Sequence, residues 1–456
     1  MKVSATRRIT IAGAGLAGSL LAVLLSRRGY AVDVFERNPD PREAGDAAGR
    51  SINLALAERG RHALAQAGLL DAVDQYTIPM RGRMLHDIDG ALTLQPYGKD
   101  ESEVIWSVHR ARLNRTLLDA ADEDPNVTLY FEHRIDDIDW DQRRLQCSGE
   151  GESPHAHDFD VLVAADGGGS AVRRSLGQVT DLGVREELLD HGYKELEIPA
   201  GPDGDFLLDP HALHIWPRGG FMMIGLPNAD RSFTGTLFLA NDGEPGFSRL
   251  QDWPAQRAFM EQHFPDVLPL MPAVREDFNN NPVGLLGTIR CQKWHYRDRA
   301  VLLGDAAHAI VPFHGQGMNA AFEDCVAFVA CLDAGDRDWA ELFSDFQARR
   351  IDNANAIADM ALENYGIMRE AVRDPRFLLR KSLEHELERQ HPERFVARYS
   401  LVMFHRISYA EAFRRGEVQS DILDTLLEEA NTLDEVNFAR AESLVSERLA
   451  PLPADD

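Results

Sequence analysis

The sequence of 456 residues is long enough for two or three domains with a sizeable core. It has 48 Lys and Arg residues against 74 Asp and Glu residues, and the net charge of -26 argues against nucleic acid and anionic membranes as partners. The four cysteines lack the spacing of a metal or redox site, so we expect no bound metal and reduced thiols in a cytoplasmic protein.

The opening stretch predicts a βαβ unit that binds a dinucleotide. A buried strand runs from Ile9 into a turn with the G-x-G-x-x-G spacing, and we expect a helix from Ser19 to about Arg27 and a strand from Ala31 to Phe35. Glu36 follows this strand, where its carboxylate accepts the ribose hydroxyls and repels a 2′-phosphate. The site therefore suits FAD or NAD rather than NADP. The glycines of the turn are Gly13, Gly15 and Gly18.

The stretch around Asp89-Gly90 predicts a β-hairpin whose turn can be closed in two ways. A two-residue turn would pair Arg83 with Pro96 and place Tyr97 on the opposite face. A three-residue turn with Gly90 in the left-handed conformation would place Arg83 and Tyr97 diagonally adjacent on one face. The sequence alone leaves both open, and Arg81 shares the face of Arg83 in either case.

Two further turns combine an acid with a glycine at the end of an expected strand. Asp166-Gly167 can bind a ligand in the crevice of an α/β sheet, or its acid can cap a helix, and the residues leave both readings open. Gly304-Asp305 begins a second strand-turn-helix segment, which a ligand longer than NAD would need. Asp305 can accept from a ribityl hydroxyl, and the helix that begins near Gly317 points its N–H groups at the ligand.

The segment from Val184 to about Pro282 alternates like β-structure, and one face of its strands is largely apolar. This face belongs either to the core or to the apolar wall of a ligand pocket. A long helix is expected over residues 338–372, where Met360, Asn364 and Met368 share one stripe, and a buried amide at Asn364 would need partners. After Pro375 the periodicity predicts an all-helical region, with one helical stretch before Gly416 and another from Ile422 to Leu449.

The remaining elements expected from the pattern are conventional in length. Helices are expected over 57–72, 107–119 and 320–332, and strands over 127–131, 158–165, 193–199, 212–216, 221–226, 232–239 and 300–303.

Taken together, the glycine turn with Glu36, Asp166-Gly167 and Gly304-Asp305 resemble the FAD-dependent aromatic hydroxylases. Within these, the likeness is greatest to the kynurenine 3-monooxygenases, and it covers essentially the whole chain. The segments that carry it are GRSINLAL at 49–56, PMRGRM at 79–84, QPYG at 95–98, GYKEL at 192–196 and PFHGQGMN at 312–319.

The resemblance implies an α/β fold with three parts. A discontinuous Rossmann-like FAD-binding domain would comprise residues 1–75, 99–180 and 285–372. A mostly antiparallel β-sheet substrate domain would be inserted at 76–98 and 181–284, and a C-terminal α-helical domain would follow at 373–456.

The same resemblance implies a set of binding residues and no catalytic side chain, with no acid–base role for His314. The residues expected to bind FAD are Gly13, Gly15, Leu16, Ala17, Gly18, Glu36, Arg37, Ala55, Arg110, Asp166, Asp305, Gly315, Gly317, Met318 and Asn319. Those expected at the amino-acid end of L-kynurenine are Arg83, Tyr97, Asn364 and Tyr399. Those expected around its ring are Met222, Ile224, Leu226, Phe238, Pro312, Phe313 and Met368.

The implied reaction belongs to tryptophan catabolism: NADPH reduces non-covalently bound FAD, O₂ is captured as a C4a-hydroperoxyflavin, and one oxygen is transferred to the ring to give 3-hydroxykynurenine. NADPH would have no Rossmann site of its own. The alternatives are an FAD-dependent hydroxylase of another aromatic acid and a flavin-fold binding protein without oxygenase activity. A plain NAD dehydrogenase is disfavoured by the second nucleotide turn.

Two features depart from the family pattern. Ile367 stands where family members often have a glutamate. Eukaryotic relatives carry a C-terminal membrane anchor, whereas this sequence ends in polar, acidic residues, so we expect a soluble, bacterial-type enzyme with no membrane partner. The oligomeric state is left open, a dimer included.

Overall fold

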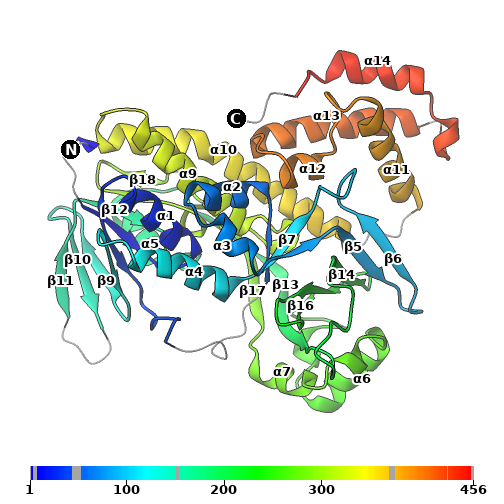
Figure 1. The fold of residues 1–456 in the computed structure, drawn as a ribbon, viewed down its shortest axis with the longest axis horizontal. Coiled ribbons are helices and arrows are strands. Elements are labelled where there is room, and N and C mark those ends of the chain that lie inside the picture. The colour runs from blue at the N-terminus through cyan, green and yellow to red at the C-terminus, as the bar shows by residue number, and fades with distance from the viewer. Residues whose placement is uncertain are drawn as a thin grey trace. The chain divides into compact units, whose positions relative to one another are not determined.

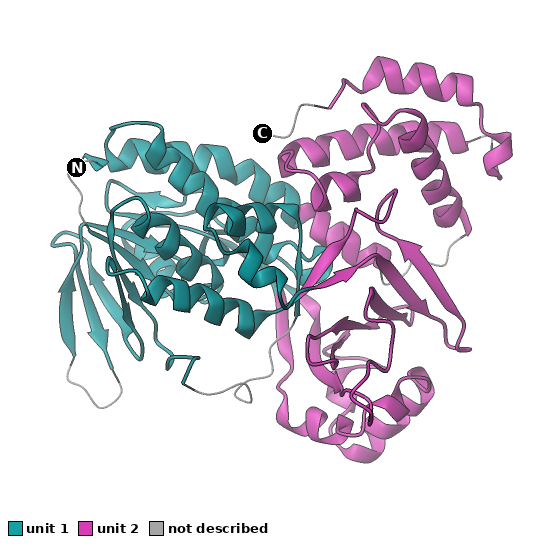
Figure 2. Cartoon of the chain, viewed as in Figure 1, with its two compact units in different colours: residues 1–77, 108–188, 287–358 teal, residues 78–107, 189–286, 359–456 magenta. Residues whose placement is uncertain are grey.

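The computed structural model describes residues 2–3, 8–43, 53–149, 154–368, 375–428 and 430–452. The chain forms two compact units, coloured separately in Figure 2. Unit 1 comprises residues 1–77, 108–188 and 287–358, and unit 2 comprises 78–107, 189–286 and 359–456. The first four residues of the GRSINLAL motif and the last four residues of the sequence lie outside the described residues.

Unit 1 is organised around a six-stranded sheet in the order β18-β19-β12-β1-β2-β8. Figure 1 labels β12 and β18 of this sheet. Five of its strands run parallel, and β18 pairs antiparallel with β19 at the edge. The central strands β1 and β12 are buried at every residue except the first of β1, as expected for a sheet covered on both faces. The strands are β1 (Arg8–Ala12), β2 (Ala31–Phe35), β8 (Val127–Tyr130), β12 (Val161–Ala164), β18 (His295–Tyr296) and β19 (Ala300–Leu302).

Helices flank this sheet, and three of them differ from expectation. The first helix begins at Leu16 rather than Ser19. The segment 57–72 forms two helices because the chain turns at Gly68, which has a φ of +59°. The helix expected from 107 begins at Arg110, because the preceding residues form a strand and His109 caps the helix. The helices of unit 1 are α1 (Leu16–Ser26), α2 (Glu58–Gln66), α3 (Leu70–Asp74), α4 (Arg110–Asp122), α5 (Ala171–Val179), α8 (Asp305–His308), α9 (Gly317–Asp333) and α10 (Trp339–Gly366), whose last residues belong to unit 2.

A three-stranded antiparallel sheet, in the order β11-β10-β9, is added to unit 1 and was not expected from the sequence. The single strand expected over 158–165 is in fact the end of β11 and the whole of β12. Its two parts separate where Phe159 donates its backbone N–H to Arg143. The strands of this sheet are β9 (Arg134–Asp139), β10 (Arg144–Ser148) and β11 (His155–Asp158).

Unit 2 contains a seven-stranded sheet in the order β17-β13-β16-β15-β14-β5-β6. Strands β5 and β14 pair in parallel, while β6, β13, β15 and β16 pair antiparallel with their neighbours, so the sheet is mostly antiparallel. Its strands are β5 (Gly82–His86), β6 (Leu92–Pro96), β13 (Arg185–Ile198, beginning in unit 1), β14 (Ala212–Pro217), β15 (Met222–Pro227), β16 (Phe233–Ala240) and β17 (Gly284–Arg290, ending in unit 1).

The β-texture expected up to residue 282 is wrong for its last part, which forms helices α6 (Trp253–His263) and α7 (Val274–Asn280). The apolar residues of both helices form one buried core with a face of the sheet. That core includes Trp216, Met223 and Leu237, so these side chains mark the helix-covered face.

The remaining short elements connect these layers. Strand β4 (Ile78–Met80) pairs antiparallel with β7 (Ile105–His109), and β3 (Asn53–Leu56) precedes α2. Single 3₁₀ turns are formed by η2 (Phe247–Arg249), η3 (Leu268–Leu270), η4 (Pro312–His314) and η6 (Leu433–Glu435).

The C-terminal region of unit 2 is helical, as expected, and has a separate apolar core. Gly416 does not interrupt it, because this glycine lies inside α13, where a Cβ would come within 2.2 Å of the Arg398 side chain. The helical stretch expected over 422–449 is divided between two helices. The helices are α11 (Pro375–Gln390), α12 (Arg398–Met403), α13 (Tyr409–Leu427) and α14 (Phe438–Arg448).

Three bulk features bear on function. No helix in the described ranges has the length and apolar character needed to cross a membrane. The four cysteines are free and buried. The described residues include no group of three or more His, Cys, Asp or Glu side chains that could hold a metal ion.

Candidate functional site

The first turn of unit 1 has the geometry that the glycine spacing predicts. Gly13 has a φ of +97°, and a Cβ on it would lie 2.6 Å from the carbonyl oxygen of Ala165. A Cβ on Gly18 would lie 2.0 Å from the carbonyl oxygen of Gly13. A Cβ on Gly15, in contrast, would meet nothing within 4 Å. Two glycines are therefore required by the fold itself, whereas Gly15 faces open space at the start of α1, where a phosphate group would bind.

Glu36 lies at the end of β2 and reaches back to the same turn. Its Oε2 accepts the backbone N–H of Ala14 at 3.0 Å, and its Oε1 accepts from the backbone and side chain of Asn38. The carboxylate thus lies beside the glycine turn, as ribose recognition requires. Leu16 and Ala17 are partly accessible in the same turn, and Arg37 is exposed after it.

The two acid turns differ in what their carboxylates do. Oδ2 of Asp166 accepts the backbone N–H groups of Ala171 and Val172 at 2.7 and 3.2 Å, so this oxygen serves the N-terminus of α5, whereas Oδ1 is buried with no hydrogen-bond partner among the described residues. The Asp305 side chain is accessible to solvent, but many protein atoms surround its carboxyl. This partial desolvation raises the pKa of the carboxyl, and the nearby charges of His308 and Arg110 oppose the rise. Arg110, exposed at the start of α4, is thereby placed within electrostatic range of Asp305.

Arg173 connects these two turns, a role that the sequence did not reveal. Its buried guanidinium donates to the carbonyl oxygens of Gly168 and Ala306, at 2.5 and 2.9 Å. The position of an arginine a few residues after an acid turn predicts this link only weakly, because the two carbonyl groups that it bonds lie far apart in the sequence.

Asn319 fixes the turn that precedes α9. Its amide donates to the carbonyl oxygens of Ala55 and Gly315 at 2.8 and 2.9 Å, and its Oδ1 accepts the N–H of Ala57 at 2.9 Å. Gly315 has a φ of +65°, and a Cβ there would lie 3.0 Å from that of Ala55. The structure therefore brings Ala55, Gly315 and Asn319 together, and the Asn319 side chain acts on the backbone. Gly317 and Met318 begin α9 beside this turn.

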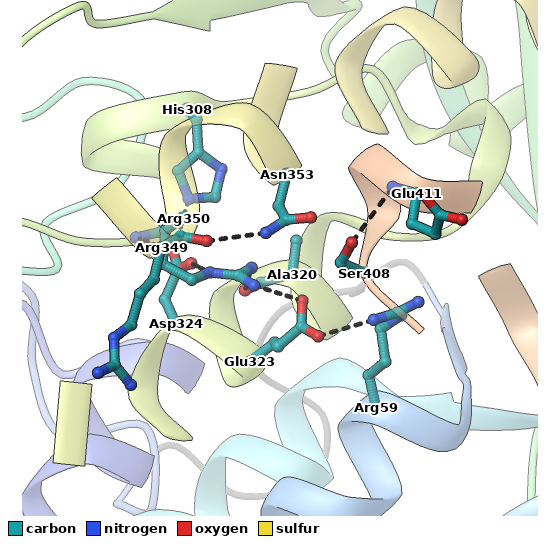
Figure 3. Close-up of polar contacts among 11 residues, drawn as sticks. Arg59, His308, Ala320, Glu323, Asp324, Arg349, Arg350, Asn353, Ser408 and Glu411 are labelled. Carbon is teal, nitrogen blue, oxygen red and sulfur yellow. Dashed lines mark hydrogen bonds and ion pairs between the residues drawn. The ribbon is translucent and has the colours of Figure 1, made fainter. Parts of the chain in front are cut away.

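A buried network of charges supports the Gly304-Asp305 turn and was not predicted (Figure 3). Asp324 on α9 accepts the backbone N–H of Gly304 at 3.0 Å, the His308 ring at 2.5 Å and Nε of Arg350 at 2.6 Å. The charges of His308 and Arg350 outweigh burial and lower the pKa of Asp324. Arg350 also forms a salt bridge with Glu323 at 2.7 Å, and Glu323 forms a second one with Arg59 at 2.7 Å. The adjacent Glu323 and Asp324 on α9 bond partners from three other segments, at Arg59, at Gly304 with His308, and at Arg350, so no local spacing predicts the network.

In unit 2 the hairpin has the three-residue turn. Arg83 pairs with Gln95, and Gly90 has a φ of +87°. Tyr97 donates its backbone N–H to the carbonyl of Arg81 at 3.0 Å. Arg83 and Tyr97 therefore lie diagonally on one face, which is the second of the two alternatives.

Arg83 lies against two tyrosines. Its Cζ is 5.6 Å from the ring centroid of Tyr97 and 4.8 Å from that of Tyr399, which α12 supplies, and the two rings stack 5.7 Å apart. Nε of Arg83 and the hydroxyl of Tyr97 are buried, and neither has a hydrogen-bond partner among the described residues. No carboxylate of the described residues pairs with Arg83, a costly state for a buried charge unless a ligand supplies the anion.

The same face of the seven-stranded sheet carries the predicted apolar residues. Leu213 pairs with Arg83 in the parallel register, and the strands beyond it pair Met222 with Phe238. Met222 and Phe238 are buried, as is Leu226, whereas Ile224 is partly accessible. This face is opposite to the one covered by α6 and α7, so it is not part of that helix-packed core.

The last predicted substrate residues come from other segments. Asn364 and Met368 are both buried in unit 2, and Asn364 Nδ2 donates to Sδ of Met368 at 3.4 Å. Helix α10 ends at Gly366, and Ile367 and Met368 continue as a π turn. Pro312 and Phe313 belong to unit 1, where Pro312 is exposed and Phe313 is buried in η4.

Comparison with known proteins shows the family to which the chain belongs. The sequence profile of the family "FAD binding domain" matches residues 6–361. A kynurenine 3-monooxygenase of Stenotrophomonas maltophilia is 49% identical over 453 residues, 99% of each chain. One of Xanthomonas euvesicatoria is 51% identical over 447 residues, 98% of each chain. The chain belongs to the kynurenine 3-monooxygenase family of FAD-binding proteins.

Solved structures of lower identity share the fold. 2-Methyl-3-hydroxypyridine-5-carboxylic acid oxygenase matches with a TM-score of 0.66 at 20% identity, over 82% of this chain and 96% of its own. PqsL of Pseudomonas aeruginosa, solved in complex with 2-aminobenzoylacetate, matches with a TM-score of 0.63 at 20% identity, over 80% of this chain and 98% of its own. The α/β hydroxylase fold expected from the sequence is thereby confirmed.

Proposed function

We propose that this protein hydroxylates the ring of L-kynurenine to 3-hydroxykynurenine, with bound FAD and with NADPH and O₂ as co-substrates. The observation that carries the proposal is the Arg83 guanidinium, whose Nε is buried and which no carboxylate of the described residues pairs. It lies on an apolar sheet face against two stacked tyrosines. The identity of about half of the chain to curated kynurenine 3-monooxygenases supports the same reaction.

The residues of unit 1 fit FAD. The open space at Gly15 and the N-terminus of α1 suit a pyrophosphate, and Glu36 suits the ribose beside it. The solvent-accessible Asp305 would accept from the ribityl chain, with Arg110 near enough to add a positive charge. When bound, FAD supplies hydride acceptance from NADPH and activation of O₂.

The residues of unit 2 would bind and orient the substrate. The Arg83 guanidinium offers a carboxylate two parallel donors, and each charge-assisted hydrogen bond contributes about 1.5–3 kcal/mol. Tyr97, Tyr399 and Asn364 would complete the amino-acid end, while Met222, Ile224, Leu226, Phe238 and Met368 would hold the ring away from water. We assign none of these side chains an acid–base role, because the amino group of the substrate itself activates the adjacent ring carbon.

Three further assignments belong to this proposal. Free, buried cysteines suit a reducing compartment, which supports a cytoplasmic location. The three-domain division, with boundaries near 75, 99, 180, 285 and 372, is retained as an interpretation alongside the two compact units. NADPH is proposed to bind without a nucleotide turn of its own, since Glu36 disfavours a 2′-phosphate in the first turn.

The test is NADPH oxidation and product analysis with L-kynurenine, and in parallel with other aromatic acids. We expect NADPH oxidation to be stimulated by L-kynurenine and 3-hydroxykynurenine to accumulate. Stimulation by another aromatic acid alone would reassign the substrate. A yellow protein that oxidises no NADPH with any of them would contradict oxygenase activity and favour a binding role.

A further inference from the structure

Tyr399 owes its position to the chain immediately before it. That chain is held at two adjacent backbone groups: Gln419 Nε2 donates to the carbonyl of Val396 at 2.7 Å, and Oε2 of Glu388 accepts the N–H of Ala397 at 3.2 Å. Ala397 is the N-cap of α12, and Tyr399 is the second residue of that helix. The Glu388 carboxylate therefore fixes the point at which the Tyr399 helix begins.

Glu388 is unusual among the carboxylates of unit 2. It is 7% exposed, and its second oxygen, Oε1, is buried with no hydrogen-bond partner among the described residues. No lysine or arginine of the described residues forms a salt bridge with it. A surface glutamate that had been covered by chance would be expected to turn toward water or toward a cation.

The charges that act on Glu388 come from the segment that follows Tyr97. Glu103 and Lys99 lie in the loop after β6, where Lys99 donates its backbone N–H to Glu103 Oε2 at 2.9 Å. Glu384 lies one turn earlier on α11 and pairs with Lys381, and His391 lies nearby on the same segment. Burial and the repulsion of Glu103 and Glu384, opposed by Lys99, raise the pKa of Glu388 to about 7.

We propose that Glu388 is a positioning residue, which holds the Ala397 backbone so that Tyr399 lies against Arg83 and Tyr97. Because burial raises its pKa, the folded segment binds the Glu388 proton more tightly than an opened, solvent-exposed segment does, so the anchor at α12 weakens as the pH rises toward about 7. The expected effect on L-kynurenine binding rests on the function proposed above, whereas the effect on the start of α12 does not.

The test combines hydrogen exchange of residues 395–403 with steady-state kinetics of the holoenzyme. We expect Glu388→Ala to speed exchange in this segment and to raise the KM for L-kynurenine roughly 10-fold, with kcat and FAD content unchanged. In the wild type, protection corrected for intrinsic exchange should decrease between about pH 5 and about pH 7, whereas Glu388→Gln should have a flat profile. Glu386→Ala is the matched control, because this glutamate lies on the same helix and, among the described residues, bonds only Arg389 and Gln390.

The outcomes separate this proposal from the proposed function. Unchanged exchange in Glu388→Ala, a pH profile in Glu388→Gln equal to that of the wild type, or an equal effect of Glu386→Ala would overturn the positioning role. If Glu388→Ala does not fold, the pH profile of Glu388→Gln decides alone. If the wild type does not hydroxylate L-kynurenine, the function fails, yet the exchange results still decide the role of Glu388 at α12.

Discussion

The glycine turn of unit 1 and the Arg83 cluster of unit 2 offer a ligand different kinds of groups. The turn presents backbone N–H groups and open space at Gly15, and its geometry is set within a few residues by Gly13 and Gly18. The cluster presents side chains, which β5, the end of β6 and α12 bring together from positions 83, 97 and 399. A local motif can therefore specify the first, whereas only the tertiary fold can assemble the second.

This difference predicts how each region responds to substitution. Changes in the turn act on backbone geometry and so affect the fold and the cofactor together, except where the structure leaves room. Changes at Arg83 and Tyr97 remove polar groups that have no hydrogen-bond partner among the described residues, Nε and the hydroxyl, so we expect them to affect the substrate more than the fold.

The largest effect is expected at Gly13. Its φ of +97° and the 2.6 Å approach of the Ala165 carbonyl mean that Gly13→Ala should destabilise the protein by about 2 kcal/mol or more and abolish FAD binding. Gly15→Ala, with nothing within 4 Å, should leave apoprotein stability unchanged and weaken FAD binding at least about 10-fold. Thermal unfolding of the apoprotein and flavin titration measure both. Full-strength FAD binding in Gly15→Ala would show that this position does not face the pyrophosphate.

The next effect is expected at Arg83. Two charge-assisted bonds of about 1.5–3 kcal/mol each predict that Arg83→Ala raises the KM for L-kynurenine at least about 100-fold, with FAD content intact. Arg81→Ala is the control, since Arg81 is an exposed arginine two residues earlier. Kinetics and flavin absorbance are measured on the same preparations. Loss of flavin in Arg83→Ala alone would assign Arg83 to the cofactor or the fold.

How much the sequence could predict follows from the same distinction. The βαβ unit, the acid turns and the apolar face of β15 and β16 were predicted because each depends on spacing within a short segment. The choice between the two hairpin turns could be made only from the observed pairing of the strands, because a turn longer by one residue moves Tyr97 to the other face of the sheet. The Asp324 network was missed because its partners are distant in sequence. Helices α6 and α7 were missed because the alternation of their residues resembled strands.

A third prediction concerns that missed network. Asp324→Asn keeps the size of the side chain but removes the charge that faces His308 and Arg350, and we expect a loss of about 3 kcal/mol in the free energy of unfolding. Asp333→Asn on the same helix is the control, because its pair with Arg28 is at the surface and should contribute under about 1 kcal/mol. Denaturant unfolding compares the two. Equal losses would mean that the network adds nothing beyond an ordinary ion pair.

The smallest effect is expected at Tyr97 and tests the comparison most directly. Burial, with a further contribution from Tyr399, raises the pKa of Tyr97 well above its usual value, so the hydroxyl keeps its proton and can donate. It has no acceptor among the described residues, so Tyr97→Phe should leave the stability of the ligand-free protein unchanged or raise it by up to about 1 kcal/mol. The KM for L-kynurenine should rise roughly 3- to 10-fold, as expected for one lost neutral hydrogen bond. A variant that loses stability with no change in KM would instead make the hydroxyl part of the fold, because a group that serves only a ligand is dispensable until the ligand arrives.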